Sequence, residues 1–123
     1  MSENNSNPVA INLHQTSRIL EVEYDDGEKF ELSCEYLRVH SPSADVKGHG
    51  PGQEVLQTGK ENVNISEIEP VGNYAVKLIF DDGHNTGLYS WSYLYELGIE
   101  HDNNWVNYLD ALKKVGYVRR PDE

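Results

Sequence analysis

The sequence predicts a segregated α+β domain: antiparallel β-hairpins form a small sheet, a short helix follows the first hairpin, and two helices lie toward the C-terminus. Three observations support this class. Runs that alternate apolar and polar residues fill the first part of the chain. Asp-Gly turns follow two of these runs, at Asp26-Gly27 and Asp82-Gly83. Segments with helical spacing come last. A length of 123 residues fits one domain, which we expect to span residues 9–116.

The first hairpin is predicted from the residues around Asp26-Gly27. Residues 1–8 are rich in Ser and Asn and are expected to form a disordered tail, and a short strand is expected from Val9. Residues 18–24 alternate apolar and polar side chains, and residues 29–34 alternate again beyond the turn. Two such runs joined through Asp-Gly indicate a β-hairpin.

A short helix and a long loop are predicted next. Within residues 33–43, Ser33 is suited to cap a helix and Pro42 cannot continue it. Residues 44–62 are rich in glycine, so we expect an irregular loop. A loop of that length inside a compact domain is functional or mobile.

The second half of the chain opens with two further strands. Residues 63–68 have a strand pattern with Pro70 at its end, and residues 74–80 give one fully apolar face. This second strand leads into Asp82-Gly83. Residues 85–90 then form either a second hairpin arm or an extended entry to a helix.

Two helices are expected at the C-terminal end. Ser90 is suited to cap a helix over residues 91–98, which Gly98 would end. Asp102 is expected to cap the last helix, and Gly116 to end it. Residues 117–123 are expected to form a polar tail.

The charge balance limits the classes of partner. The formal net charge is -11, from 21 acidic and 10 basic residues, and this charge repels phosphate backbones. Nucleic acid is therefore not expected as a partner. The sequence contains no run of about 20 apolar residues, so a membrane span is not expected. The single cysteine, Cys34, suits a reducing compartment, so we expect a cytoplasmic protein.

The sequence offers little support for catalysis. The histidines lack the paired short spacing of a structural zinc site, and none is followed by an acid as His-x-Asp or His-x-Glu. Cys34 stands beside Glu35, whose charge discourages a thiolate. Neither a Gly-x-Ser-x-Gly elbow nor a phosphate-binding loop is present. We therefore expect no cofactor and no enzymatic activity, with an enzyme of unrecognised type as an open alternative.

Two segments carry a resemblance to a known family. They are LRVHSPSADVKGHGPGQ, residues 37–53, and VGNYAVKLIFDDGHNTGLYSWSYLYELG, residues 71–98. Together they resemble the gamma-butyrobetaine hydroxylase-like N-terminal domain family over residues 14–100. Members of that family occur in carnitine-biosynthesis dioxygenases, fused to some ATPases of iron-sulfur cluster assembly, and as stand-alone small bacterial proteins. This chain looks like a stand-alone bacterial member.

The resemblance also implies a position for a structural zinc. In the dioxygenases this domain holds zinc with three cysteines and one later histidine. By resemblance, the cysteine positions correspond to Ser41, Ser43 and Val46, and the histidine position to His84. Because a hydroxyl is a poor zinc ligand and valine is none, the family zinc is not expected here. The catalytic domain of the dioxygenases has no counterpart in this sequence.

These observations predict a non-catalytic binding or accessory domain with a protein partner. The candidate binding residues are the polar side chains of the family-like segments: Arg38, His40, His49, Asp82 and His84. The alternative is a metal-linked accessory protein in iron-sulfur cluster assembly. In that alternative His84, with neighbouring acids or with His49, would be a transient metal ligand.

Overall fold

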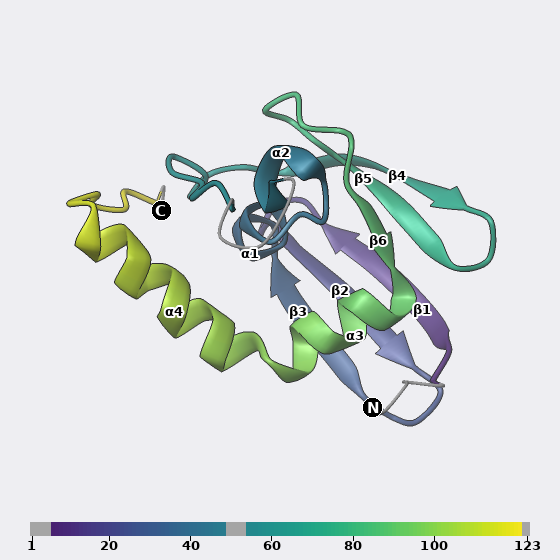
Figure 1. Ribbon diagram of the computed structural model, residues 1–123. Helices are drawn as coiled ribbons and strands as arrows, with labels where there is room; N and C mark the ends of the chain where they lie inside the picture. The colour runs from purple at the N-terminus through teal and green to yellow at the C-terminus, as the bar shows by residue number, and fades with distance from the viewer. Residues whose placement is uncertain (1–5, 49–53, 122–123) are drawn as a thin grey trace.

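The computed structural model describes residues 6–48 and 54–121. These residues form two antiparallel sheets of three strands each, together with four helices. Figure 1 shows the first sheet in purple and blue, the second in teal and green, and the longest helix running along one side of the molecule. The predicted α+β class is confirmed, as are the short helix after the first hairpin and the two C-terminal helices. The strands form two small sheets.

The first sheet contains the predicted hairpin. Strands β1 (Pro8–His14), β2 (Ile19–Tyr24) and β3 (Lys29–Ser33) pair in sequence order, and Gly27 turns the chain between β2 and β3 with a φ of 91°. The end of the expected disordered tail is part of this sheet. Asn7 donates its backbone N–H to Asp25 over 3.0 Å, and Pro8 is the first residue of β1.

Helix α1 (Cys34–Val39) begins as predicted, because Ser33 accepts a hydrogen bond from the Tyr36 N–H over 3.0 Å. The expected loop over residues 44–62 opens with a helical turn, α2 (Ala44–Lys47), which Ser43 caps. The prediction of a wholly irregular loop was therefore wrong for these four residues.

The second sheet resolves the alternatives for residues 85–90. Strands β4 (Ile65–Val71), β5 (Ala75–Phe80) and β6 (Leu88–Ser90) pair in sequence order, so the segment after Asp82-Gly83 forms a third strand. Pro70 lies inside β4 opposite Val76, and not at the end of the strand as expected. Because β4 pairs only with β5 within the described residues, it is an edge strand, where proline is tolerated.

One core joins both sheets with α1 and α3 (Trp91–Ile99). Three tyrosine hydroxyls in this core donate hydrogen bonds to backbone carbonyls. Tyr24 donates to the Trp91 carbonyl oxygen over 2.7 Å. Tyr36 and Tyr89 each donate over 2.6 Å, to the carbonyl oxygens of Leu97 and Leu37. Tyrosine therefore supplies apolar area and a hydrogen-bond partner for backbone carbonyls of α1 and α3. The largest fully buried aliphatic residues of this core are Leu20, Leu32, Leu37, Ile65, Leu78, Leu94 and Leu97.

The C-terminal helices differ from the prediction at two positions. Ser90 caps α3 as expected, but the helix continues through Gly98. A Cβ at position 98 would lie 2.4 Å from ring carbons of Phe30, so this glycine permits close packing and does not end the helix. Helix α4 (His101–Lys114) begins directly after Glu100. Asp102 lies within its first turn and does not cap it.

Gly116 ends α4 as predicted. Its φ of 78° is the left-handed conformation that glycine adopts readily. The Gly116 N–H donates to the Lys113 carbonyl, and the Tyr117 N–H donates to the Leu112 carbonyl, each over 3.0 Å. These two bonds form a Schellman motif, which turns the following residues back toward the body of the molecule.

None of the helices in the described ranges has the length and apolar character of a membrane-spanning helix.

Gly98→Ala tests the close contact between α3 and Phe30. Alanine favours a helix over glycine by about 1 kcal/mol, but the added methyl group would overlap the Phe30 ring. We expect the free energy of unfolding to fall by about 1–3 kcal/mol, measured by urea unfolding. Glu96→Ala, at an exposed position of α3, is the control and should have little effect. A more stable Gly98→Ala protein would contradict the packing argument.

Candidate functional site

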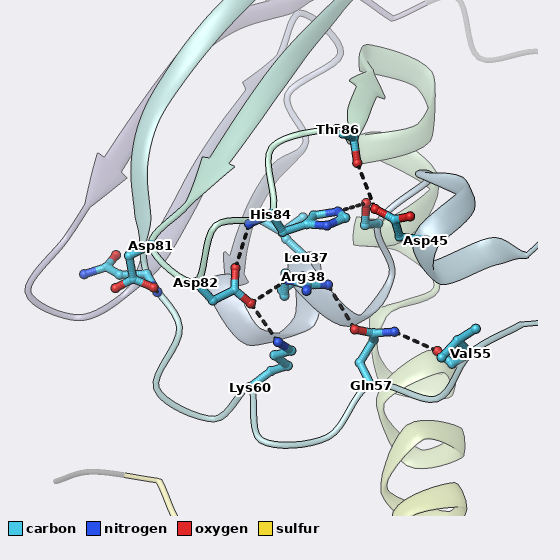
Figure 2. A network of polar contacts seen from close by, with 12 residues as sticks. Leu37, Arg38, Asp45, Val55, Gln57, Lys60, Asp81, Asp82, His84 and Thr86 are labelled. Carbon is cyan, nitrogen blue, oxygen red and sulfur yellow. Dashed lines mark hydrogen bonds and ion pairs between the residues drawn. The ribbon is translucent and has the colours of Figure 1, made fainter.

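The candidate site is centred on the carboxylate of Asp82, in the turn after β5. One of its oxygens accepts the backbone N–H of His84 over 3.1 Å. The other oxygen accepts Arg38 Nε over 2.9 Å and Lys60 Nζ over 2.8 Å. Figure 2 shows these three donors converging on Asp82 from different segments. The carboxylate therefore joins α1, the segment after α2 and the β5–β6 turn.

Arg38 extends the same network. Its side chain is 9% exposed, and its Nη1 donates to Gln57 Oε1 over 3.2 Å. A buried guanidinium needs such partners, because an unpaired charge in the interior is costly. Burial raises the pKa of Asp82, but hydrogen bonds from Lys60, the His84 backbone and Arg38 outweigh burial and lower that pKa to about 2. Asp82 is therefore ionised at neutral pH.

His84 is buried beside this network and contacts Ser41. Its Nε2 lies 2.8 Å from Ser41 Oγ, which also accepts the Ser43 backbone N–H over 3.2 Å. Burial, followed by the positive charge of Arg38, lowers the pKa of His84 below its ordinary value, so the ring is neutral at physiological pH. A Cβ on Gly87 would lie 2.6 Å from Ser41 Oγ, and this crowding explains the glycine at that position.

Of the four positions at which the resemblance implies zinc, two are in direct side-chain contact in the structure. Ser41 and His84 are hydrogen-bonded, whereas Ser43 Oγ pairs with Thr86 over 2.7 Å and Val46 is a buried apolar residue. One imidazole, two hydroxyls and an alkyl side chain do not fit zinc, which takes nitrogen, thiolate or carboxylate ligands. In the described part of the chain, no group of three or more His, Cys, Asp or Glu side chains is placed to hold a metal.

The remaining predicted residues lie apart from Asp82 or outside the described ranges. His40 Nδ1 contacts the Tyr36 carbonyl over 2.9 Å, and the His40 ring packs against Tyr36 and Tyr108. His49 falls outside the described residues. Arg38 and His84 are buried, so their contribution to partner binding stays a prediction. Cys34 is also buried, and this burial raises its pKa to about 11.

A pocket of about 260 Å³ lies on the side of α1 that faces α4. Its walls come from the two helices α1 and α2, the segment 54–57 and α4. Most of the side chains around it are apolar, and Lys47 and Glu54 bring opposite charges. Sequence reasoning did not identify this pocket, although the apolar pair Val55-Leu56 within a polar loop was a visible signal. The lining residues are Val39, His40, Val46, Lys47, Glu54, Val55, Leu56, Gln57 and Tyr108.

The fold and the site define a small α+β domain whose polar residues contact one another beside an apolar pocket. The family model described as gamma-butyrobetaine hydroxylase-like, N-terminal, matches residues 11–95. The chain therefore belongs to this family, as its two quoted segments predicted. The match ends before α4 begins.

Three solved structures are similar to this chain over most of their own length. Two solution NMR structures share 51% and 50% of residues with it, with TM-scores of 0.82 and 0.80, and their matches cover 98% and 96% of this chain and 92% and 93% of theirs. A crystal structure of a protein with unknown function, from Acidithiobacillus ferrooxidans and of the DUF971 family, is 43% identical with a TM-score of 0.63. That match covers 74% of this chain and 91% of the other. No curated protein matches the sequence.

Asp82→Asn tests the central carboxylate, because it removes the charge and keeps the shape of the side chain. We expect the free energy of unfolding near pH 7 to fall by about 1–2 kcal/mol, a value that allows for solvent screening. The pKa of Asp82 in the folded protein is below its ordinary value of 3.8. Its contribution is therefore present above that value and is lost as the pH falls through about 2.

Urea unfolding at pH 7 and at about pH 2.5 measures this effect. The difference in free energy of unfolding between the unchanged and Asp82→Asn proteins should be smaller at the lower pH. Asp110→Asn is the control. Asp110 pairs with Lys114 on the exposed face of α4 over 3.2 Å, so its loss should cost no more than about 0.5 kcal/mol. Equal effects of the two substitutions would contradict the assigned role of Asp82.

A triple variant, Ser41→Cys, Ser43→Cys and Val46→Cys, tests the equivalence with the family zinc positions. Three thiolates with the His84 imidazole provide the ligands that structural zinc prefers. We expect the variant to bind one equivalent of zinc in elemental analysis, whereas the unchanged protein binds none at these residues. Adding His84→Ala should weaken zinc binding by about tenfold or more. Failure of the folded triple variant to bind zinc would show that the four positions do not converge.

Proposed function

We propose that this protein is a non-catalytic accessory domain that binds a protein partner through the apolar pocket beside α1. The observation that carries the proposal is the contrast between two neighbouring sets of residues. The polar side chains around Asp82 contact one another, whereas two apolar side chains at the pocket, Val55 and Leu56, are 52% and 38% exposed.

The polar set is poorly suited to acid–base catalysis. A general acid or base works best with a pKa near the operating pH and with access to its substrate. Asp82 has a pKa of about 2 and accepts three donors, and Ser41 is fully buried against His84. These residues have the environment of structural groups, which position the segments around the pocket.

The size and charge of the pocket favour a protein partner. Its volume of about 260 Å³ lies below the range of about 300–1,000 Å³ that small-molecule pockets usually have. It is large enough to receive an apolar side chain from a partner. Because the whole chain carries a net charge of -11, a partner with basic residues around that apolar anchor would be attracted electrostatically.

Leu56→Asp tests this surface. A buried carboxylate in the pocket would oppose an apolar anchor, so we expect partners captured by the unchanged protein to bind at least about tenfold more weakly. Capture from an extract, followed by calorimetry with the purified partner, measures the loss. Val106→Asp is the matched control, because Val106 is 64% exposed on α4 and does not line the pocket.

Three outcomes would contradict the proposal. Equal capture by the Leu56→Asp protein would place the contact surface elsewhere. Turnover of iron and 2-oxoglutarate by the purified protein alone would show catalysis. Bound metal that is lost with His84→Ala would favour the metal-linked accessory role in iron-sulfur cluster assembly.

A further inference from the structure

The residues after α4 do not extend away from the molecule. The Schellman motif at Gly116 turns them back, and Tyr117 donates its hydroxyl to Glu61 Oε2 over 2.7 Å. The Arg120 N–H donates to the same oxygen over 2.7 Å, and Asn62 Nδ2 donates to the Arg120 carbonyl over 3.4 Å. In Figure 1 the yellow C-terminal end accordingly lies beside the teal segment that follows α2. The expected polar tail is therefore hydrogen-bonded to the body of the molecule as far as residue 120.

The strongest contact of this segment is an ion pair with Glu35 on α1. The Glu35 side chain is 6% exposed, and both of its oxygens accept hydrogen bonds from Arg119. The guanidinium also lies 5.2 Å from the centre of the Trp105 ring on α4. Among the described residues, Arg119 is the one cation that contacts Glu35. A buried carboxylate is costly without such a partner, so α1 depends on Arg119 being in place.

The residues after α4 also support one wall of the pocket. Residues 54–62 are held from both sides, and the Val55 N–H donates to the Val46 carbonyl over 2.8 Å. The Gln57 side-chain oxygen accepts a hydrogen bond from Arg38. The Gln57 backbone carbonyl accepts a hydrogen bond from the Tyr108 hydroxyl over 2.7 Å. Glu61 is held by the residues after α4. The position of Val55 and Leu56 therefore rests on Asp82 and Arg38 on one side and on the C-terminal residues on the other.

We propose that α4 and residues 117–121 form a latch, closed by the Glu35–Arg119 ion pair, that holds residues 54–62 in the shape that completes the pocket. Both parts of the latch lie outside the residues 11–95 that match the family model, so the latch is an addition to the matched domain. The effect of the latch on partner binding rests on the proposed function. Opening the latch lowers the fraction of molecules with a complete pocket. The apparent affinity for the partner falls in proportion to that fraction.

Amide hydrogen exchange of the Arg119→Ala protein tests the latch. Loss of a charge-assisted pair should speed exchange at Tyr117, Arg120 and Val55 by about tenfold or more. Leu78, in the central strand β5, should be unchanged in conditions where exchange proceeds by local opening.

Arg120→Ala is the matched control. Arg120 neighbours Arg119 in the latch but, among the described residues, makes its hydrogen bonds through the backbone alone. Its exchange pattern should match that of the unchanged protein. Glu35→Gln provides a second opening variant if Arg119→Ala does not fold, because it removes the charge without leaving an unpaired carboxylate.

Two outcomes would overturn the latch. Equal acceleration at Leu78 and Val55 would show global destabilisation, and acceleration at Tyr117 without any at Val55 would show that the latch does not reach the pocket. These outcomes are distinguishable from failure of the proposed function. In that case the exchange changes would appear as expected, but Leu56→Asp would leave partner capture unaffected.

Discussion

The arrangement of the site depends on one carboxylate shared by three donors. The Asp82 carboxylate accepts hydrogen bonds from Arg38, Lys60 and the His84 backbone N–H. These donors belong to α1, the segment after α2 and the β5–β6 turn. Helix α1 is fixed by its own burial in the core, whereas the segment after α2 and the β5–β6 turn are irregular. A charge that is partly shielded from water interacts more strongly than one on an open surface, so a single acidic side chain can hold the two irregular segments against α1. The rest of the site is built on this junction.

The Ser41–His84 contact supports the same junction from the other side. At positions where the family resemblance implies metal ligands, this chain places a buried hydrogen bond of 2.8 Å between a hydroxyl and a neutral imidazole. A hydrogen bond contributes far less than a structural zinc site, whose binding energy is folding energy. The surrounding packing therefore has to contribute more. Gly87 permits close approach to Ser41, and Tyr89 donates its hydroxyl to the Leu37 carbonyl over 2.6 Å.

Local sequence signals predicted the elements well, because their physical causes are local. Ser33 and Ser90 cap helices through contacts only three residues away, and Asp-Gly turns set the hairpins. Gly98 was misread because its neighbour, Phe30, is distant in the chain and leaves no trace in the local pattern. The same limit applies to the site. Arg38 and Asp82 were both candidates, but their pairing across 44 residues could not be derived from spacing.

The acidic composition has a structural meaning beyond solubility. Asp82 and Glu61 hold the segment around residues 54–62 from its two sides, one through side-chain cations and the other through a tyrosine hydroxyl and a backbone N–H. Glu35 anchors the C-terminal residues in turn. A segment with so little apolar area cannot order itself by burial, because the entropy of a flexible chain would outweigh the gain. Pairing with fixed carboxylates supplies the missing free energy, and it leaves Val55 and Leu56 free to face the pocket rather than the core.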